Sequence, residues 1–215
     1  AAIIVQDPGA AVVARQAGYE GEIHFSTLAN VSHPASLAAV ASLSGLGVTR
    51  VVTPRELNVD ELKTMAAACP EGMGLETFVH GALCYGVSGR CYWSGFLGGK
   101  SGLRGRCVQP CRRQYDNSGR KAGFFSCQDL GLDLLAKTLL NIGQVSAWKI
   151  EGRKKGPHYV FYTVTAYRML RENPEDPSVK KTVEDILEQA LGRPRTRYNF
   201  LPQRQFPPVE AHKDT

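Results

Sequence analysis

The strongest constraint on the fold is a repeated alternation of short apolar runs, rich in β-branched and aromatic residues, with longer amphipathic stretches. The runs are Ile3–Val5, Ile23–Phe25, Val51–Thr53, Phe78–Val79 and, much later, Trp148–Ile150. Helix signals lie between the first four; in one of these stretches Asn58 and Glu61 have the spacing of a capping box. This alternation predicts an α/β fold with a parallel sheet, either open and doubly wound or closed as a barrel.

Polar residues follow each of these runs. Active sites of such folds gather at the carboxyl ends of the strands, so we expect a functional rim there. Six rim residues are candidate catalytic groups: His80, and five that are expected to form charge pairs that orient substrate, namely Arg55, Glu56, Lys149, Glu151 and Arg153. The alternative is that polar residues simply mark strand ends and that a single histidine such as His80 is structural.

About seventy residues separate the fourth run from the fifth, which is far more than an ordinary connection needs. This gap holds five of the six cysteines: Cys84, Cys91, Cys107, Cys111 and Cys127. Thiolates are the ligands of iron–sulfur clusters and of zinc. Zinc ribbons and fingers show paired Cys-x2-Cys knuckles, and the chain has none, so the spacing favours a cluster over zinc. Reduced, unligated cysteines are the third interpretation.

The chain opens without an initiator Met, inside an apolar run, which predicts that residues upstream are missing. It shows no basic-then-apolar leader and no stretch of roughly eighteen apolar residues, so we expect a cytoplasmic protein without a membrane span. Six cysteines in such a chain indicate thiols or metal ligands rather than disulfides. Outside the gap, Cys69 is most simply a small buried hydrophobe.

A basic cluster lies among the cysteines. The net charge is +6, and residues 100–121 contain seven Lys or Arg against one acid, Asp116. The alternatives are a solvated loop and a polyanion-binding surface. On the second interpretation, the candidate nucleic-acid contacts are Lys100, Arg104, Arg106, Arg112 and Arg113. Tyr92, Trp93, Phe96 and Tyr115 would then stack on an unpaired base, or else pack beneath the glycine-rich loop.

We divide the chain at residue 156. Residues 1–156 are expected to form an α/β unit that includes a Cys-rich insertion at 81–128. Residues 157–215 are expected to form two helices, from Pro157 to about Arg171 and from about Ser178 to Leu191, followed by an irregular basic tail.

Four segments together resemble the peptidase U32 family: Glu76–Cys84, Ser88–Ser94, Arg104–Arg112 and Lys149–Arg153. The resemblance implies strands four to eight of a (β/α)8 barrel, with the first three missing, and a 4Fe-4S cluster on four cysteines. Cys84, Cys91 and Cys107 match three ligand positions of the family. We favour Cys127 as the fourth ligand, with Cys111 as the alternative.

Members of that family are described as collagenase-like peptidases, or as factors that hydroxylate tRNA, rRNA or the ubiquinone ring without molecular oxygen. The chain contains neither a His-Glu-x-x-His helix nor a Gly-x-Ser-x-Gly elbow, so peptidase chemistry has little direct support. Oxygen-independent hydroxylation of RNA bases, with tRNA or rRNA as partner, is therefore our first hypothesis. A peptidase and a non-catalytic cluster-binding module are the alternatives.

Overall fold

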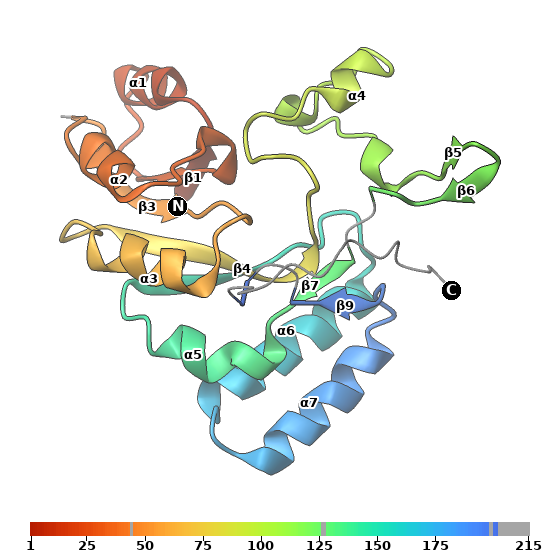
Figure 1. The fold of residues 1–215 in the computed structure, drawn as a ribbon. Coiled ribbons are helices and arrows are strands. Elements are labelled where there is room, and N and C mark those ends of the chain that lie inside the picture. Colours follow the sequence, from red (N-terminus) through yellow and green to blue (C-terminus); the bar gives the residue numbers. More distant parts are fainter. Residues whose placement is uncertain (44, 126–127, 198–199, 202–215) are drawn as a thin grey trace.

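The computed structural model describes residues 1–43, 45–125, 128–197 and 200–201, which form a mixed α/β structure (Figure 1). The strands are β1 (Ala2–Val5), β2 (Glu22–Phe25), β3 (Val48–Val52), β4 (Gly74–Ala82), β5 (Tyr115–Asn117), β6 (Arg120–Ala122), β7 (Asp129–Gly131), β8 (Val145–Ile150) and β9 (Arg195–Thr196). The α-helices are α1 (Pro8–Gln16), α2 (Pro34–Ala41), α3 (Val59–Ala67), α4 (Trp93–Phe96), α5 (Ala136–Leu140), α6 (Pro157–Glu172) and α7 (Pro177–Gln189). Short 3₁₀ turns lie at Thr27–Ala29, Gly102–Arg104, Pro110–Arg112 and Asp133–Leu135.

The main sheet is mostly parallel. β1, β2, β3 and β4 pair in that order, and β8 pairs with β4, all in parallel. These are the five strands expected from the apolar runs, and the α/β class is confirmed. Among the described residues β1 pairs only with β2 and β8 only with β4, so closure into a barrel is not observed.

The end of β4 carries an addition that the sequence patterns did not predict. β7 pairs antiparallel with β4, and β9 pairs in parallel with β7. His80 pairs with Gly131 of β7 on one side and with Ile150 of β8 on the other, so β7 takes the edge of β4 that β3 occupies further back. β7 and β9 are too short for a periodic pattern to reveal them.

Helix caps and buried apolar residues explain the rest of the scaffold. Asn58 accepts hydrogen bonds from Asp60 N and Glu61 N, and the Glu61 carboxylate accepts one from Asn58 N, so the expected capping box of α3 is confirmed. The core consists of side chains such as Phe25, Leu37, Val51, Leu75 and Leu139. Burial of these side chains is the main source of the sheet's stability.

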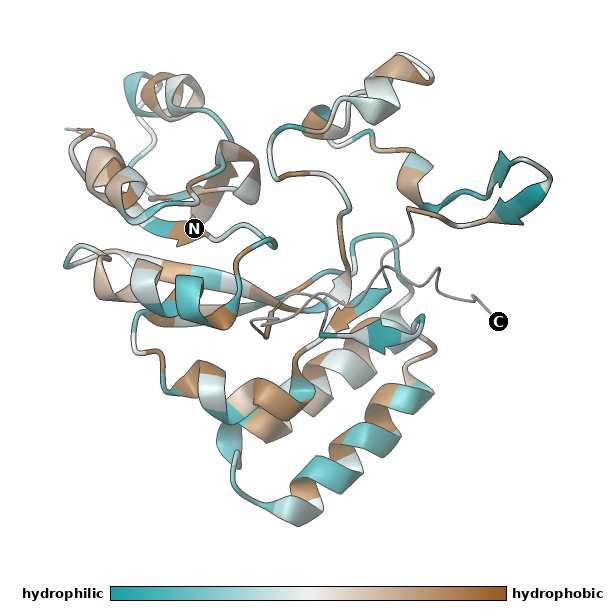
Figure 2. Cartoon of the chain, in the orientation of Figure 1, coloured by the Kyte–Doolittle hydropathy of each residue, from teal (hydrophilic) through white to brown (hydrophobic). Residues whose placement is uncertain are grey.

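Two parts of the molecule lie on opposite sides of the sheet end. Helices α5, α6 and α7 pack together on one side, and the two helices expected after residue 156 are confirmed as α6 and α7 (Figure 1). The chain between β4 and β7 rises on the other side, with the two-stranded β5–β6 hairpin at its outer end (Figures 1 and 2). No helix in the described ranges is long and apolar enough to cross a membrane.

Candidate functional site

The thiol groups of Cys84, Cys91, Cys107 and Cys111 share one neighbourhood above the end of β4. A negative charge on Cys91 or Cys111 disfavours ionisation of Cys84, and one on Cys91 or Cys107 disfavours ionisation of Cys111. In the part of the chain that the structure describes, no three His, Cys, Asp or Glu side chains are grouped closely enough to hold a single metal ion. The described thiols are therefore neighbours that do not enclose one ion.

Hydrogen-bond donors point at these sulfurs. Cys107 Sγ accepts from Gln109 N at 3.3 Å and from Ser94 Oγ at 3.6 Å. Burial raises the pKa of Cys84 and of Cys111, and backbone N–H groups of Gly86 and Tyr85 offset part of that rise. Such donors stabilise a thiolate, which is the form that binds metal. Metal binding here would have to displace thiol protons.

The loop between Cys84 and Cys91 packs closely against neighbouring residues at two of its glycines. A Cβ atom at Gly86 would lie 2.9 Å from Cys91 Cβ and 3.2 Å from Cys91 Sγ. Gly89 has φ +73°, and a Cβ there would overlap the carbonyl oxygen of Leu28. Only glycine fits both requirements at position 89. The loop is therefore fixed against the segment after β2.

Glu56 clamps the same loop to the scaffold. Its carboxylate accepts a short hydrogen bond from Ser88 N and a second one from Ser88 Oγ at 2.8 Å. Ser88 is buried. Because Glu56 follows β3 and Ser88 lies between Cys84 and Cys91, this contact sets where those two cysteines stand relative to the sheet.

A second clamp holds the other end of the cysteine segment. Asp129 is 1% exposed and pairs with Arg193 at 2.7 Å and with Arg112 at 3.5 Å. Arg112 also donates to the carbonyl oxygen of Leu83 at 2.8 Å. Arg112, a candidate nucleic-acid contact in the sequence, is thus mostly buried and engaged beside Cys111.

The rim residues of β3, β4 and β8 form charge pairs. Arg55 pairs with Glu151 at 3.0 Å and lies 3.7 Å from the centre of the Phe78 ring. Glu76 pairs with Lys149 at 2.5 Å and with Arg50 at 3.5 Å. These contacts bring three of the rim candidates, Arg55, Lys149 and Glu151, to one edge of the sheet around Phe78.

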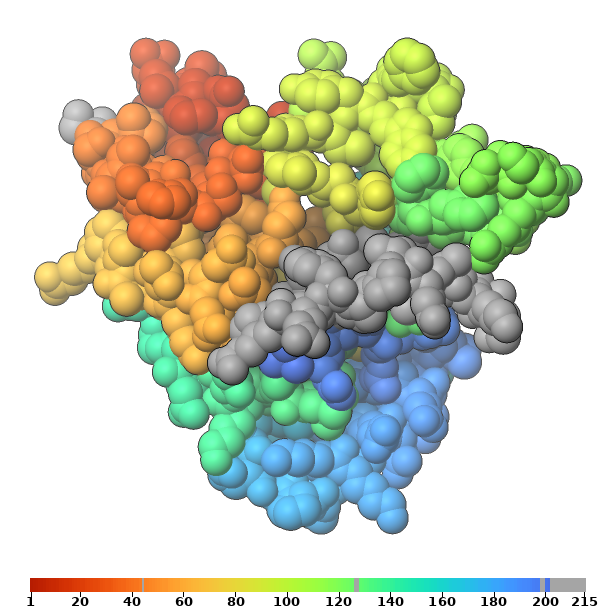
Figure 3. All heavy atoms as spheres, viewed as in Figure 1, coloured from red at the N-terminus to blue at the C-terminus, as the bar shows by residue number. Residues whose placement is uncertain are grey.

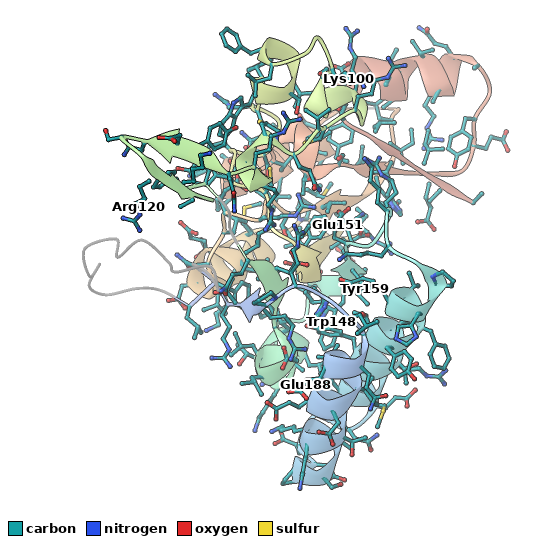
Figure 4. All side chains as sticks on the ribbon, turned by 90° about the vertical axis from the view of Figure 1, so that its right-hand side faces the viewer. Lys100, Arg120, Trp148, Glu151, Tyr159 and Glu188 are labelled. Atoms are coloured by element: carbon teal, nitrogen blue, oxygen red, sulfur yellow. The ribbon has the colours of Figure 1, made fainter. Side chains whose placement is uncertain are left out.

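Arg153, a rim candidate that follows β8, contacts the cysteine segment. Arg153 donates to the carbonyl oxygen of Gly105 at 3.3 Å. Gly81, with φ +105°, lies where any Cβ would overlap the backbone of Glu151. Figure 4 shows Glu151 toward the centre of the molecule. The catalytic role of these residues stays a prediction.

His80 is enclosed rather than presented to a substrate. It is 3% exposed, and its ring packs edge-on against Tyr167. The Tyr167 hydroxyl donates to Val79 O at 2.8 Å and accepts from Leu132 N at 3.1 Å, so His80 Nδ1, at 3.3 Å, must be the donor to it. Burial lowers the pKa of His80 to about 4. His80 is thus a neutral, internally bonded group at pH 7.

The basic and aromatic candidates separate into two groups. Six of the seven cations of residues 100–121 are exposed, all except Arg112, and none of the six forms an ion pair with any residue that the structure describes. Trp93 and Tyr115 stack at 5.8 Å and both contact the edge of Phe125. Tyr92 and Phe96 are 71% and 89% exposed. Only the second pair is open to a base.

Cys127, the favoured fourth ligand, lies outside the described residues. Cys69 is half-buried and donates to Met73 O at 3.3 Å, away from the other thiols. Three polar partners of the site were missed from the sequence: Glu76, Ser88 and Asp129. The first has a local signal, since a carboxylate inside an apolar strand needs a buried cation; the other two have none.

Comparisons with known proteins agree on one family. The family model described as "Peptidase family U32" matches residues 1–208. The chain is 34% identical over 185 residues to a protein named "Collagenase" from Porphyromonas gingivalis, covering 78% of this chain and 43% of that protein. It is 33% identical over 184 residues to "tRNA hydroxylation protein P" from Helicobacter pylori, with the same coverage of 78% and 43%.

A third relative acts on ribosomal RNA by its name. "23S rRNA 5-hydroxycytidine C2501 synthase" from Escherichia coli is 31% identical over 191 residues, covering 86% of this chain and 27% of that protein. The chain spans less than half the length of these relatives. No solved structure matches it.

Proposed function

Because the chain belongs to peptidase family U32, we propose that it holds a 4Fe-4S cluster on its cysteine segment and acts in the oxygen-independent hydroxylation of RNA bases. The observation that carries the proposal is the gathering of four thiols with N–H and O–H donors directed at their sulfurs. Four cysteines are the usual ligand set of such a cluster, and hydrogen bonds to its sulfurs tune its potential.

Cys84, Cys91 and Cys107 would hold three corners of the cluster, with Cys127 or Cys111 as the fourth. Charge interactions link the Cys111 thiol to those of Cys84, Cys91 and Cys107, and this supports Cys111 as a candidate fourth ligand beside Cys127. A bound cluster supplies one-electron chemistry that side chains lack. We also propose that the parallel order β1-β2-β3-β4-β8 is an arc of a (β/α)8 barrel whose other strands lie outside this chain.

The protein's own residues would bind and orient the RNA. Tyr92 and Phe96, one helical turn apart and exposed, are placed to stack on an unpaired base. Arg104 and Arg106 lie beside Cys107 and would neutralise phosphates there. The Arg55–Glu151 and Lys149–Glu76 pairs would present fixed charges to the base at the rim. RNA is the substrate class that the names of two of these relatives give.

Anaerobic purification followed by iron, sulfide and visible-absorption measurements tests the cluster. We expect about four irons and four sulfides per chain, in line with the cluster type proposed. A colourless, iron-free protein after reconstitution would refute the redox part of the proposal.

Mass spectrometry of nucleosides from a deletion strain tests the RNA substrate. We expect one hydroxylated pyrimidine to disappear from tRNA or rRNA and to return when the wild-type gene is restored. The Cys84→Ser gene should fail to restore it. A nucleoside profile that is the same with and without the gene contradicts RNA hydroxylation and leaves the cluster untouched.

A peptidase is the second candidate, favoured by the relative named "Collagenase". Gelatin cleavage by the purified protein decides between the two. Cleavage that survives replacement of Cys84 and Cys91 would assign a proteolytic site independent of the cluster. Absence of cleavage, together with a lost nucleoside in the deletion strain, leaves RNA hydroxylation.

A further inference from the structure

The β5–β6 hairpin contributes almost nothing to the core. In its two strands only Tyr115 and Ala122 are partly buried, and both lie at its base. An isolated two-stranded hairpin is marginally stable in water, so its shape must be maintained by other means. Figures 1 and 3 show it standing out from the body at the outer end of the cysteine segment.

The sequence nevertheless encodes a defined hairpin. Ser118 and Gly119 have φ values of 55° and 85°, the left-handed pair that a two-residue type I′ turn requires. The Asp116 carboxylate accepts a hydrogen bond from Gly119 N at 2.8 Å and so stabilises the turn. Asp116 is also the cross-strand neighbour of Lys121. The turn is therefore specified locally and does not depend on packing.

The base of the hairpin is fixed to the cysteine segment. The ring of Tyr115 stacks on Trp93, and its hydroxyl donates to Pro110 O at 2.9 Å, next to Cys111. Arg120 lies 5.9 Å from the centre of the Phe124 ring. A displacement of the cysteine segment would therefore carry the hairpin with it. The distance between the charges at the tip of the hairpin and the thiols is therefore fixed.

The tip presents cations to solvent. Arg120 and Lys121 are exposed and form no ion pair within the described part of the chain, and Figure 4 shows Arg120 at the outer edge of the molecule. Lys100 stands at another outer edge in the same view. Unpaired cations fixed on a projecting arm are suited to phosphates of a folded polyanion and not to one small ligand.

We propose that the β5–β6 hairpin is an arm that contacts the phosphate backbone of a folded RNA away from the nucleotide that enters the site. This rests on the proposed RNA substrate and adds a second contact region to it. Arg120 and Lys121 would give affinity and orientation without reading bases. Short RNA that spans only the reacting nucleotide would not reach them.

The test compares two RNAs and two variants of the full-length protein. One variant is R120A/K121A; the matched control, K180A/K181A, removes the same charge from α7 at the far end of the molecule. The probes are an unmodified transfer RNA transcript and a short single-stranded RNA, with binding followed by fluorescence anisotropy at several salt concentrations. Iron content is measured for each protein.

For R120A/K121A we expect affinity for the transcript to fall on the order of tenfold at low salt and the salt slope to decrease by about 1 for each residue removed. Affinity for the short RNA and iron content should match those of the wild type. K180A/K181A should match the wild type on both probes.

Unchanged affinity of R120A/K121A for the transcript would overturn the inference while leaving the proposed function standing. Equal loss on both probes would place the hairpin within the reacting site and also overturn it. Vesicles of anionic lipid serve as a third probe. If R120A/K121A loses binding to these vesicles but keeps its affinity for both RNAs, the arm contacts a membrane surface and the inference is overturned. A wild-type protein that binds neither RNA removes both the inference and the RNA substrate.

Discussion

The sheet with its helices and the cysteine segment are held together by different forces. The scaffold buries one cluster of apolar side chains, drawn from positions between Ala11 and Phe200. Between Cys84 and Phe125, by contrast, the only buried residues are Ser88, Ser94 and Pro110. The segment is positioned by side-chain contacts to the backbone, by ion pairs and by a small cluster of half-buried aromatic rings around Trp93. Its geometry therefore depends on a few polar groups, and by our proposal on metal, whereas the scaffold depends on many interchangeable apolar contacts.

Ligand removal gives the largest expected effect and separates the two regions most clearly. Cys84→Ser, Cys91→Ser or Cys107→Ser should each reduce iron and sulfide to background, while far-ultraviolet circular dichroism of the scaffold stays close to that of the wild type. Protease cleavage within residues 84–125 should increase, because few side chains of the segment are buried.

Cys69→Ser is the matched control, since its thiol lies apart from the others, and it should retain iron. Separate Cys111→Ser and Cys127→Ser variants identify the fourth ligand. If the Cys84, Cys91 and Cys107 variants all keep their iron, the segment is not organised by metal.

The second largest effect is expected from removal of Asp129, the buried carboxylate that joins the two regions. Asp129→Ala removes the buried carboxylate with which Arg112 and Arg193 pair, and we expect the free energy of unfolding in urea to fall by about 3 kcal/mol. Asp185→Ala, on the outer face of α7, should change it by less than about 0.5 kcal/mol. Equal effects of the two variants would show that the clamp contributes nothing to stability.

Because His80 is enclosed in the scaffold, we expect the stability of the scaffold to depend on pH. The folded pKa of His80 is about 4 and the ordinary value is 6.5, so the unfolded chain binds the proton first as pH falls. The contribution is complete above pH 6.5 and is lost as pH falls from 6.5 toward 4. Between pH 7 and pH 5 the loss should be about 2 kcal/mol.

Urea unfolding at the two pH values measures this loss. His80→Asn keeps a donor for Tyr167 and has no titrating ring, so its stability should depend less on pH by that amount. A pH dependence that is the same in His80→Asn and the wild type would mean that other groups control acid sensitivity.

The smallest expected effect comes from destabilising helix α3, which tests whether a less stable scaffold changes the cysteine segment. Asn58→Ala removes the cap of α3 and should cost about 1 kcal/mol, whereas Asn58→Gly should cost only a few tenths. Neither variant touches the Glu56 or Asp129 clamps, so iron content should not change. Iron loss in Asn58→Ala would show that the two regions are more tightly coupled than their contacts indicate.

The same division explains how much of the molecule could be predicted from its sequence. The five parallel strands, the Asn58–Glu61 capping box and the helices after residue 156 follow from local periodicity and capping, and all are observed. The Glu56–Ser88 and Asp129–Arg193 contacts join residues 32 and 64 positions apart, for which no local pattern exists. The hairpin has a local signal in its Ser118-Gly119 turn, but the polar residues on either side of that turn lack the apolar alternation of a strand.

The pairing of β4 with β7 has a consequence for how such proteins diversify. The cysteine segment leaves the sheet after Ala82 and returns at Asp129, and these two residues are direct neighbours in an antiparallel pair. A chain segment whose two ends are adjacent in a sheet can be exchanged, lengthened or replaced by a tight turn without a change in the sheet. Provided that Asp129 keeps a cationic partner, the segment that we propose to hold the cluster and to contact RNA can vary in sequence and length while the sheet that carries it stays the same.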